Sequence, residues 1–457
     1  NIFIDGLSAI GQISDYQKDT YEIYTNMILK LYKNIDRIVK IELIQNNLKL
    51  LQEDEIFNFT YEVLWEDSII SFDKRYDIYY DPSTKNIKFR IISIINSIAM
   101  MIVVMGFALW ILMRTLKYDL LRYNKLGLFQ NDAEFDDQYG WKLVHKDVFR
   151  VPKYFEFLSA FVGIGLQLFA TSILTAFLCV FFNTIYDEIT HISNFVLYIY
   201  ATVSPLSSFI SSAIYKKYGG TKHYKNFFIQ IFFFPFILLL IKSIISIHAR
   251  ILNSSRYLYF STFIYFSMFY LLCIVPLSWM GSLVARYFIK AEDFHLLTSD
   301  IPGPIPRRKW YLRFWPLAFL SGLLPFGAVI VEMCFIFVSF WNTKVFLVLQ
   351  FSIIVLFVMI CISISTNIIS TYVLLNSEDY RWHWLSYFSG LTVGLYIMFY
   401  AIVYQLKRTY VSGSFQLAFY YLYSSLICLS IGMMCGSFNY IASNIFIQRL
   451  YNSVKSD

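Results

Sequence analysis

The sequence has little charge and few cysteines for its length. Only 15% of its 457 residues are Asp, Glu, Lys or Arg, whereas soluble domains carry about 25%. Hydrophobic residues make up 57% of the chain and aromatic residues 20%. This balance excludes a protein that folds wholly in water and indicates that most of the chain lies in a lipid bilayer.

The sequence also lacks the patterns that would indicate chemistry. All six cysteines fall inside apolar windows, so they fit neither a disulfide framework nor a zinc site. No Ser/His/Asp order, HExxH, P-loop or dinucleotide fingerprint occurs in a supporting context. We therefore predict no catalytic residue, no metal, no cofactor and no enzymatic activity. The net charge of +7 lies in short loops beside apolar windows, which predicts no nucleic-acid partner.

The first 90 residues contain no window apolar enough to span a membrane. Period-two alternation from Val39 to Leu43 and from Phe57 to Trp65 predicts short antiparallel strands in a small β-rich domain over 1–90. The sequence opens with Asn1 and shows no secretory leader. We interpret the chain as a fragment or a processed protein.

Windows of about 20 apolar residues, the length of a bilayer span, recur from Ile91 onward. They predict a polytopic α-helical membrane protein with nine transmembrane helices in 91–448 and an exposed tail at 449–457. The expected helices are 91–113, 156–182, 192–214, 227–247, 259–283, 314–340, 345–375, 385–406 and 415–447.

Lys and Arg are distributed unequally between the two alternating sets of loops. One set carries only five of them, and the other carries 21, in the segments 114–155, 215–226, 284–313, 376–384 and 448–457. Because Lys and Arg favour the cytosolic side of a membrane, we expect the basic set in the cytosol. With nine spans, the N-terminal domain is then luminal and the C-terminal tail cytosolic.

Glu332 is the only acidic residue well inside any apolar window. An ionisable group at the bilayer centre costs at least about 2.5 kcal/mol, which makes it a candidate functional residue. One interpretation is a proton-linked or cation-linked site. The other is a hydrogen-bonded Glu that joins helices, with Asn367 of the next span as a candidate partner.

Two GxxxG steps occur near the C-terminus, at Gly390 and Gly394 and at Gly432 and Gly436. Such steps let helix backbones approach closely. They predict either packing within the chain or a surface for the transmembrane helix of another protein.

Several loop runs are distinctive. They are Phe72–Asp77 (FDKRYD), Asp81–Ser83 (DPS), Gly140–Arg150 (GWKLVHKDVFR), Tyr215–Gly220 (YKKYGG), Ile301–Pro306 (IPGPIP) and Glu378–Trp382 (EDYRW). Together these runs resemble the nonaspanins, also called the transmembrane 9 superfamily, across nearly the whole chain.

The resemblance implies a protein of Golgi and endosomal membranes with a larger luminal β domain than 1–90. It implies retention by the coatomer coat, which reads a C-terminal Lys-x-Asp/Glu, here Lys455 and Asp457. It also implies sorting of membrane-protein cargo with Gly-rich transmembrane helices. Independently of the resemblance, Asn58 opens an N-glycosylation sequon in the segment expected to be luminal.

Three hypotheses follow for the function. The first is a sorting receptor or chaperone that recognises other transmembrane helices. The second, motivated by Glu332 and by proline-interrupted helices, is an ion or solute transporter or channel. The third is a scaffold whose luminal domain binds glycans or proteins.

Overall fold

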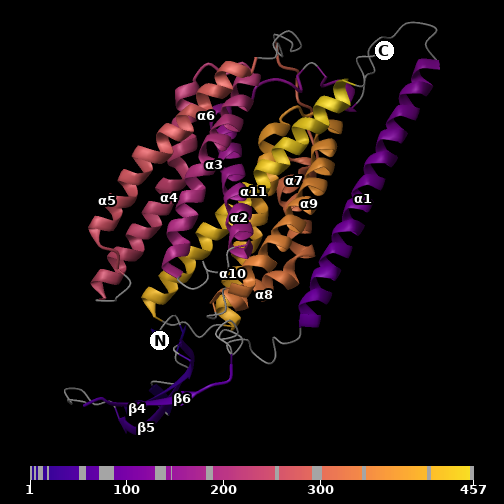
Figure 1. Cartoon of the computed structure of the whole chain (residues 1–457). Coiled ribbons are helices and arrows are strands. Elements are labelled where there is room, and N and C mark those ends of the chain that lie inside the picture. Colours follow the sequence, from indigo (N-terminus) through magenta and orange to yellow (C-terminus); the bar gives the residue numbers. More distant parts are fainter. Residues whose placement is uncertain are drawn as a thin grey trace. The chain divides into compact units, whose positions relative to one another are not determined.

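A computed structural model of the chain shows a small β unit and a larger helical unit (Figure 1). The N-terminal unit contains the strands, and the second unit contains the helices from Ile92 onward. The structure describes residues 3–4, 7–8, 14–17, 20–35, 37–50, 58–70, 87–128, 140–145, 147–181, 189–252, 257–290, 301–341, 346–408 and 413–452.

The N-terminal unit is built on one long hairpin. β4 and β5 pair antiparallel, and Leu31, Val39, Ile41 and Leu43 form their buried face. β3 pairs antiparallel with β4, whereas β1 and β2 form a two-stranded sheet of their own. The strands are β1 (Phe3–Ile4), β2 (Leu7–Ser8), β3 (Ser14–Gln17), β4 (Thr20–Asn34), β5 (Arg37–Leu50) and β6 (Thr60–Asp67).

The strand expected near 57–65 is present as β6, but the prediction of antiparallel pairing is wrong for it. β5 covers one edge of β4, so β6 skips β5 and pairs parallel with β4 at the other edge. The ion pair between Lys30 Nζ and Glu66 Oε1, at 3.3 Å, joins the two strands. The alternating side chains of Tyr61, Val63 and Trp65 are exposed rather than buried.

The helical unit follows the apolar windows closely. Among the described residues, eight helices are long and apolar enough to cross a membrane, and the chain is a polytopic membrane protein. The elements are α1 (Ile87–Leu128), α2 (Phe155–Phe181), α3 (Ile189–Lys217), α4 (His223–Ile251), α5 (Phe260–Phe269), a π-helical turn (Tyr270–Ile274), α6 (Val275–Phe288), α7 (Phe314–Ala328), α8 (Ile330–Trp341), α9 (Phe346–Asn376), α10 (Trp382–Arg408) and α11 (Ser414–Asn452).

One expected span is not a single helix. The window 314–340 forms two shorter helices, α7 and α8, which meet at Val329. Pro325 lacks a backbone N–H and Gly327 is a weak helix former, so the backbone hydrogen bonds of the helix are weakened just before the break. By contrast, α5, the π-helical turn and α6 run on as one continuous span, Phe260–Phe288.

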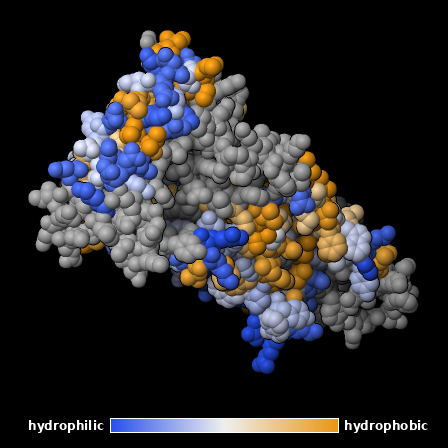
Figure 2. Space-filling model, turned by 90° about the horizontal axis from the view of Figure 1, so that it is seen from below, coloured by the Kyte–Doolittle hydropathy of each residue, from blue (hydrophilic) through white to orange (hydrophobic). Residues whose placement is uncertain are grey.

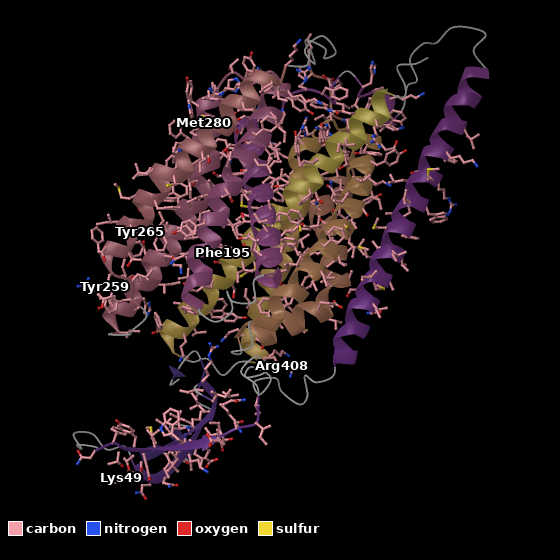
Figure 3. The ribbon with its side chains drawn as sticks, viewed as in Figure 1. Lys49, Phe195, Tyr259, Tyr265, Met280 and Arg408 are labelled. Atoms are coloured by element: carbon pink, nitrogen blue, oxygen red, sulfur yellow. The ribbon has the colours of Figure 1, made fainter. Side chains whose placement is uncertain are left out.

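The described residues of the five basic loop segments lie at one end of the bundle, called here the basic end. There the chain reverses between α3 and α4 and between α9 and α10 (Figure 1). Tyr259 and Arg408 lie at the opposite end, and Met280 lies nearer the basic end (Figure 3). Where the structure describes them, the two loop sets that the Lys and Arg counts distinguish thus lie at opposite ends.

Many side chains on the outside of the helices are apolar. Phe107, Phe236, Leu272 and Phe399 are each more than half exposed, and hydrophobic residues form a broad area on the face seen in Figure 2. Lipid tails are the solvent that such a surface requires.

The interior of the bundle depends on small residues at helix contacts. Gly390 of α10 lies against Gly436 of α11, and Gly394 lies against Gly432 one turn further along. All four glycines are buried in this contact. They pack α10 on α11 within the chain, so the alternative of a glycine surface open to another protein's helix is wrong.

This contact yields a stability prediction. A Cβ atom at Gly390 would overlap the backbone of Cys435 and Gly436, so Gly390→Ala should destabilise the bundle by about 1–3 kcal/mol. The matched control is Gly106→Ala in α1, where an added Cβ meets nothing within 4 Å. Thermal unfolding in detergent, followed by tryptophan fluorescence, compares the two. Equal midpoints would contradict the tight contact.

Candidate functional sites in the helix bundle

Loops that are far apart in the sequence meet at the basic end. The indole Nε1 of Trp382 donates to the carbonyl oxygen of Val148 at 2.9 Å. The backbone N–H of Gly303 donates to Asp147 Oδ2 at 3.0 Å. The runs Gly140–Arg150, Ile301–Pro306 and Glu378–Trp382 are therefore parts of one structure, called here the loop cap.

A buried carboxylate ties the loop cap together. Asp379 pairs with Arg308, and its Oδ1 accepts from Arg381 Nε at 3.1 Å. The side chains of Asp379 and Arg308 are only 3% and 10% exposed. Burial by itself raises the pKa of Asp379, but the hydrogen bonds from Arg381 and the charge of Arg308 outweigh it and hold the pKa below its ordinary value.

The cap rests on an aromatic floor at the ends of the helices. His383 lies among the rings of Phe155, Tyr218, Trp382 and Tyr440. These residues belong to the same buried cluster as the cap residues Val148 and Phe149. The cap residues therefore pack against the ends of the helices as part of the core of the membrane domain.

Glu332 is buried beside the helix break. It is 1% exposed, and its Oε1 accepts a hydrogen bond from the hydroxyl of Ser97 in α1. Glu332 lies in the first turn of α8, where the positive end of the helix dipole stabilises a carboxylate. The structure thus joins Glu332 to α1 rather than to Asn367.

Asn367 belongs to a different polar network, which connects α9, α10 and α11. Its Nδ2 donates to Ser443 Oγ at 2.7 Å and to the carbonyl oxygen of Asn439 at 3.0 Å, and its Oδ1 accepts from Ser389 at 2.7 Å. Asn439 Nδ2 donates to Ser389 and to Ser363. The expected pairing of Asn367 with Glu332 is wrong, because these nearer partners satisfy the amide.

A large cavity lies between the helices, with a volume of about 1540 Å³. Its walls come from α2 to α5 and from α8 to α11, and they consist mainly of Phe, Leu, Ile and Met side chains. Lys242 contributes a cation to the lining, and its Nζ lies 5.2 Å from the ring centroid of Tyr423. An apolar cavity of this size fits a chain of hydrocarbon or an apolar helix segment rather than a polar metabolite.

The sequence matches the family Endomembrane protein 70 over residues 1–414. The chain belongs to this family. It is 30% identical to a transmembrane 9 superfamily member 4 of Arabidopsis thaliana over 97% of the chain and 75% of the relative. It is also 30% identical to a transmembrane 9 superfamily member 1 of Saccharomyces cerevisiae, covering 89% of the chain and 60% of the relative.

A further family relative, from Dictyostelium discoideum, bears the name putative phagocytic receptor 1b and is 28% identical over 98% of the chain. None of these three names is that of an enzyme. No solved structure matches the chain. The resemblance to the transmembrane 9 superfamily is therefore confirmed, as is the membrane protein that it implies.

The functions expected for the other residues singled out in the sequence remain predictions. Lys455 and Asp457 lie outside the described residues. Asn58 is exposed beside β6, which is compatible with a glycan acceptor.

Sequence reasoning missed the cavity, because each wall residue looks like an ordinary core residue along its own helix. It also missed that the motif loops contact one another. Their Trp, Asp and Arg residues could have indicated such contacts, because these side chains form hydrogen bonds and ion pairs.

The loop cap yields a second prediction. Arg308→Met leaves the buried Asp379 carboxylate short of one cation and should destabilise the protein by roughly 3 kcal/mol at pH 7. The folded pKa of Asp379 is depressed, so this stabilisation is present above the unfolded pKa of about 3.9 and is lost as pH falls through the folded pKa. The difference from wild type should therefore shrink below about pH 4.

Thermal unfolding in detergent at pH 7 and pH 3 measures both effects. The matched control is Arg307→Met, which removes the neighbouring, exposed guanidinium. If the two variants lost stability equally, the buried ion pair would have no special role in the cap.

Proposed function

We propose that this protein sorts or chaperones other transmembrane proteins in Golgi and endosomal membranes, by holding one of their helices in the apolar cavity. The cavity is the observation that supports the proposal. A cylinder about 10 Å wide and 20 Å long, roughly 13 residues of a slim helix, has a volume of about 1600 Å³. The cavity volume of about 1540 Å³ is of the same size.

Cargo with Gly-rich helices suits such a cavity. Helices that carry many small residues are slim and associate through close backbone contact rather than through large side chains. The chain's own GxxxG glycines are already used between α10 and α11. Recognition therefore depends on the cavity walls, and the wall residues are where the proposal can be tested.

A photo-crosslinking experiment tests the cavity directly. Phe263 and Ile264 are neighbours on α5, but only Phe263 lines the cavity. With p-benzoylphenylalanine at Phe263, we expect a crosslink to a co-expressed single-span reporter that has a Gly-rich transmembrane helix. The same probe at Ile264 should give none, because that side chain is exposed on the outside of the helix.

The control cargo is the same reporter with its transmembrane glycines changed to leucine, which should crosslink far less at Phe263. Equal crosslinks from both probe positions, or to both reporters, would reject the cavity as the cargo site.

The orientation belongs to the same proposal. The basic end faces the cytosol, following the positive-inside rule, and the N-terminal unit is luminal, where Asn58 accepts a glycan. The tail is then cytosolic, and the coatomer coat reads Lys455 and Asp457. An ammonium close to a carboxylate presents charged groups that a polar receptor pocket binds.

A localisation experiment tests the tail. In cells, Lys455→Ala combined with Asp457→Ala should release the tagged full-length protein from the Golgi toward the cell surface or lysosome. The control is Asn452→Ala with Ser453→Ala, which changes two nearby residues and keeps the motif. Unchanged localisation of the motif variant would refute coatomer retention through these residues.

A second candidate function, ion or solute translocation, is favoured by one observation. Glu332 is buried three residues after the break between α7 and α8, and discontinuous helices often bind ions or substrates at their breaks. A flux into proteoliposomes that is lost in Glu332→Gln would establish this function. Without such a flux, Glu332 is a structural link to α1.

A further inference from the structure

A cluster of positive charge lies where α3, α4 and α6 end at the basic end. Arg286 near the end of α6 contacts two aromatic rings, with its Cζ 5.1 Å from the ring centroid of Tyr224 and 5.4 Å from that of Trp279. Lys216 at the end of α3 donates its ammonium to the carbonyl oxygen of Arg286. His223 opens α4, and the charges of Arg286 and Lys216 both act on it.

Three nitrogen atoms of this cluster have no hydrogen-bond partner among the described residues. They are the buried Nε and Nη2 atoms of Arg286 and the buried Nδ1 atom of His223. Burying such groups without partners is costly, so each unpaired buried group requires an explanation. Ring contacts satisfy the face of the guanidinium, but they leave its N–H groups unused.

The two unused nitrogens of Arg286 point to an anion with two oxygens. Nε and one Nη form the edge of the guanidinium that binds phosphate or carboxylate through two parallel hydrogen bonds. In the described part of the chain, no ion pair involves Arg286, Lys216 or His223; the nearby Glu156 pairs instead with Lys225 at 2.6 Å. The first turn of α4 carries no acidic residue and no side-chain cap, so its positive dipole end adds to the charge.

The depth of the cluster indicates the source of the anion. The apolar span of α3 ends at Lys217, that of α4 begins at His223, and that of α6 ends at Phe288. This is the level at which lipid phosphates lie beside a membrane protein. Phe288, two residues after Arg286, and Phe228, five residues after His223, are exposed apolar side chains that acyl chains could cover.

We propose that Arg286, Lys216 and His223 form a binding site for the phosphate of an anionic phospholipid. Nε–H and Nη2–H of Arg286 donate to two phosphate oxygens, Lys216 supplies a second positive charge, and His223 donates from Nδ1. The site lies outside the apolar cavity, since none of its three residues lines that cavity, and it does not depend on cargo binding.

The experiment uses the purified full-length chain in detergent. Dioctanoyl phosphatidic acid is titrated while native mass spectrometry measures the bound fraction. Dioctanoyl phosphatidylcholine and inorganic phosphate are titrated in parallel. Phosphatidic acid should bind with saturation, and Arg286→Gln should weaken it about ten-fold or more, the usual effect of losing a charged hydrogen-bond pair. Arg286→Lys keeps the charge but not the two-pronged edge, so its binding should be intermediate.

Arg250→Gln removes an exposed cation at the other end of α4 and is the matched control; its affinity should equal that of wild type. If Arg286→Gln does not fold, Lys216→Gln combined with His223→Gln serves the same test. Equal binding of phosphatidylcholine, or unchanged affinity in these variants, would overturn the proposal. Inorganic phosphate that competes fully at the same concentration would replace the lipid with a soluble anion as the ligand.

Discussion

The membrane domain depends on a constraint of its solvent: a polar group inside a bilayer must find its partner within the protein. The network around Asn367 and Asn439 meets that requirement for three helices at once. Between α10 and α11, Gly390 and Gly436 allow a close approach, and there the short side chain of Ser389 reaches Asn439. Small residues thus set the distance between the helices, and the amide hydrogen bonds fix which residues face each other.

The same pattern recurs on the other side of α2. Gln167 accepts a hydrogen bond from Ser207, and Gln230 donates to Ser207, which joins α2, α3 and α4. The apolar cavity lies between these two polar networks, with walls from both groups of helices. Each network joins the helices of its own group, and the cavity has walls from both groups.

Hydropathy predicted most helix ends to within a few residues, because lipid imposes the same length and apolarity on every span. The exception is α1, which continues past the expected end at 113 to Leu128. It could not predict the break at Val329, which depends on the local ladder near Pro325 and not on mean apolarity. Nor could it predict whether Glu332 would reach Asn367 or Ser97, since that choice depends on how helices face each other. The parallel placement of β6 escaped prediction for a similar reason: alternation identifies a strand but not its neighbour.

The break between α7 and α8 also constrains how the protein is made. The two halves have 15 and 12 residues, and each is shorter than the roughly 20 residues that a span requires. They must therefore enter the bilayer as a pair. Glu332 enters with them, and its hydroxyl partner Ser97 was synthesised 235 residues earlier. α1 must therefore remain beside the site of insertion until Glu332, the hydrogen-bond partner of Ser97, has been synthesised and inserted.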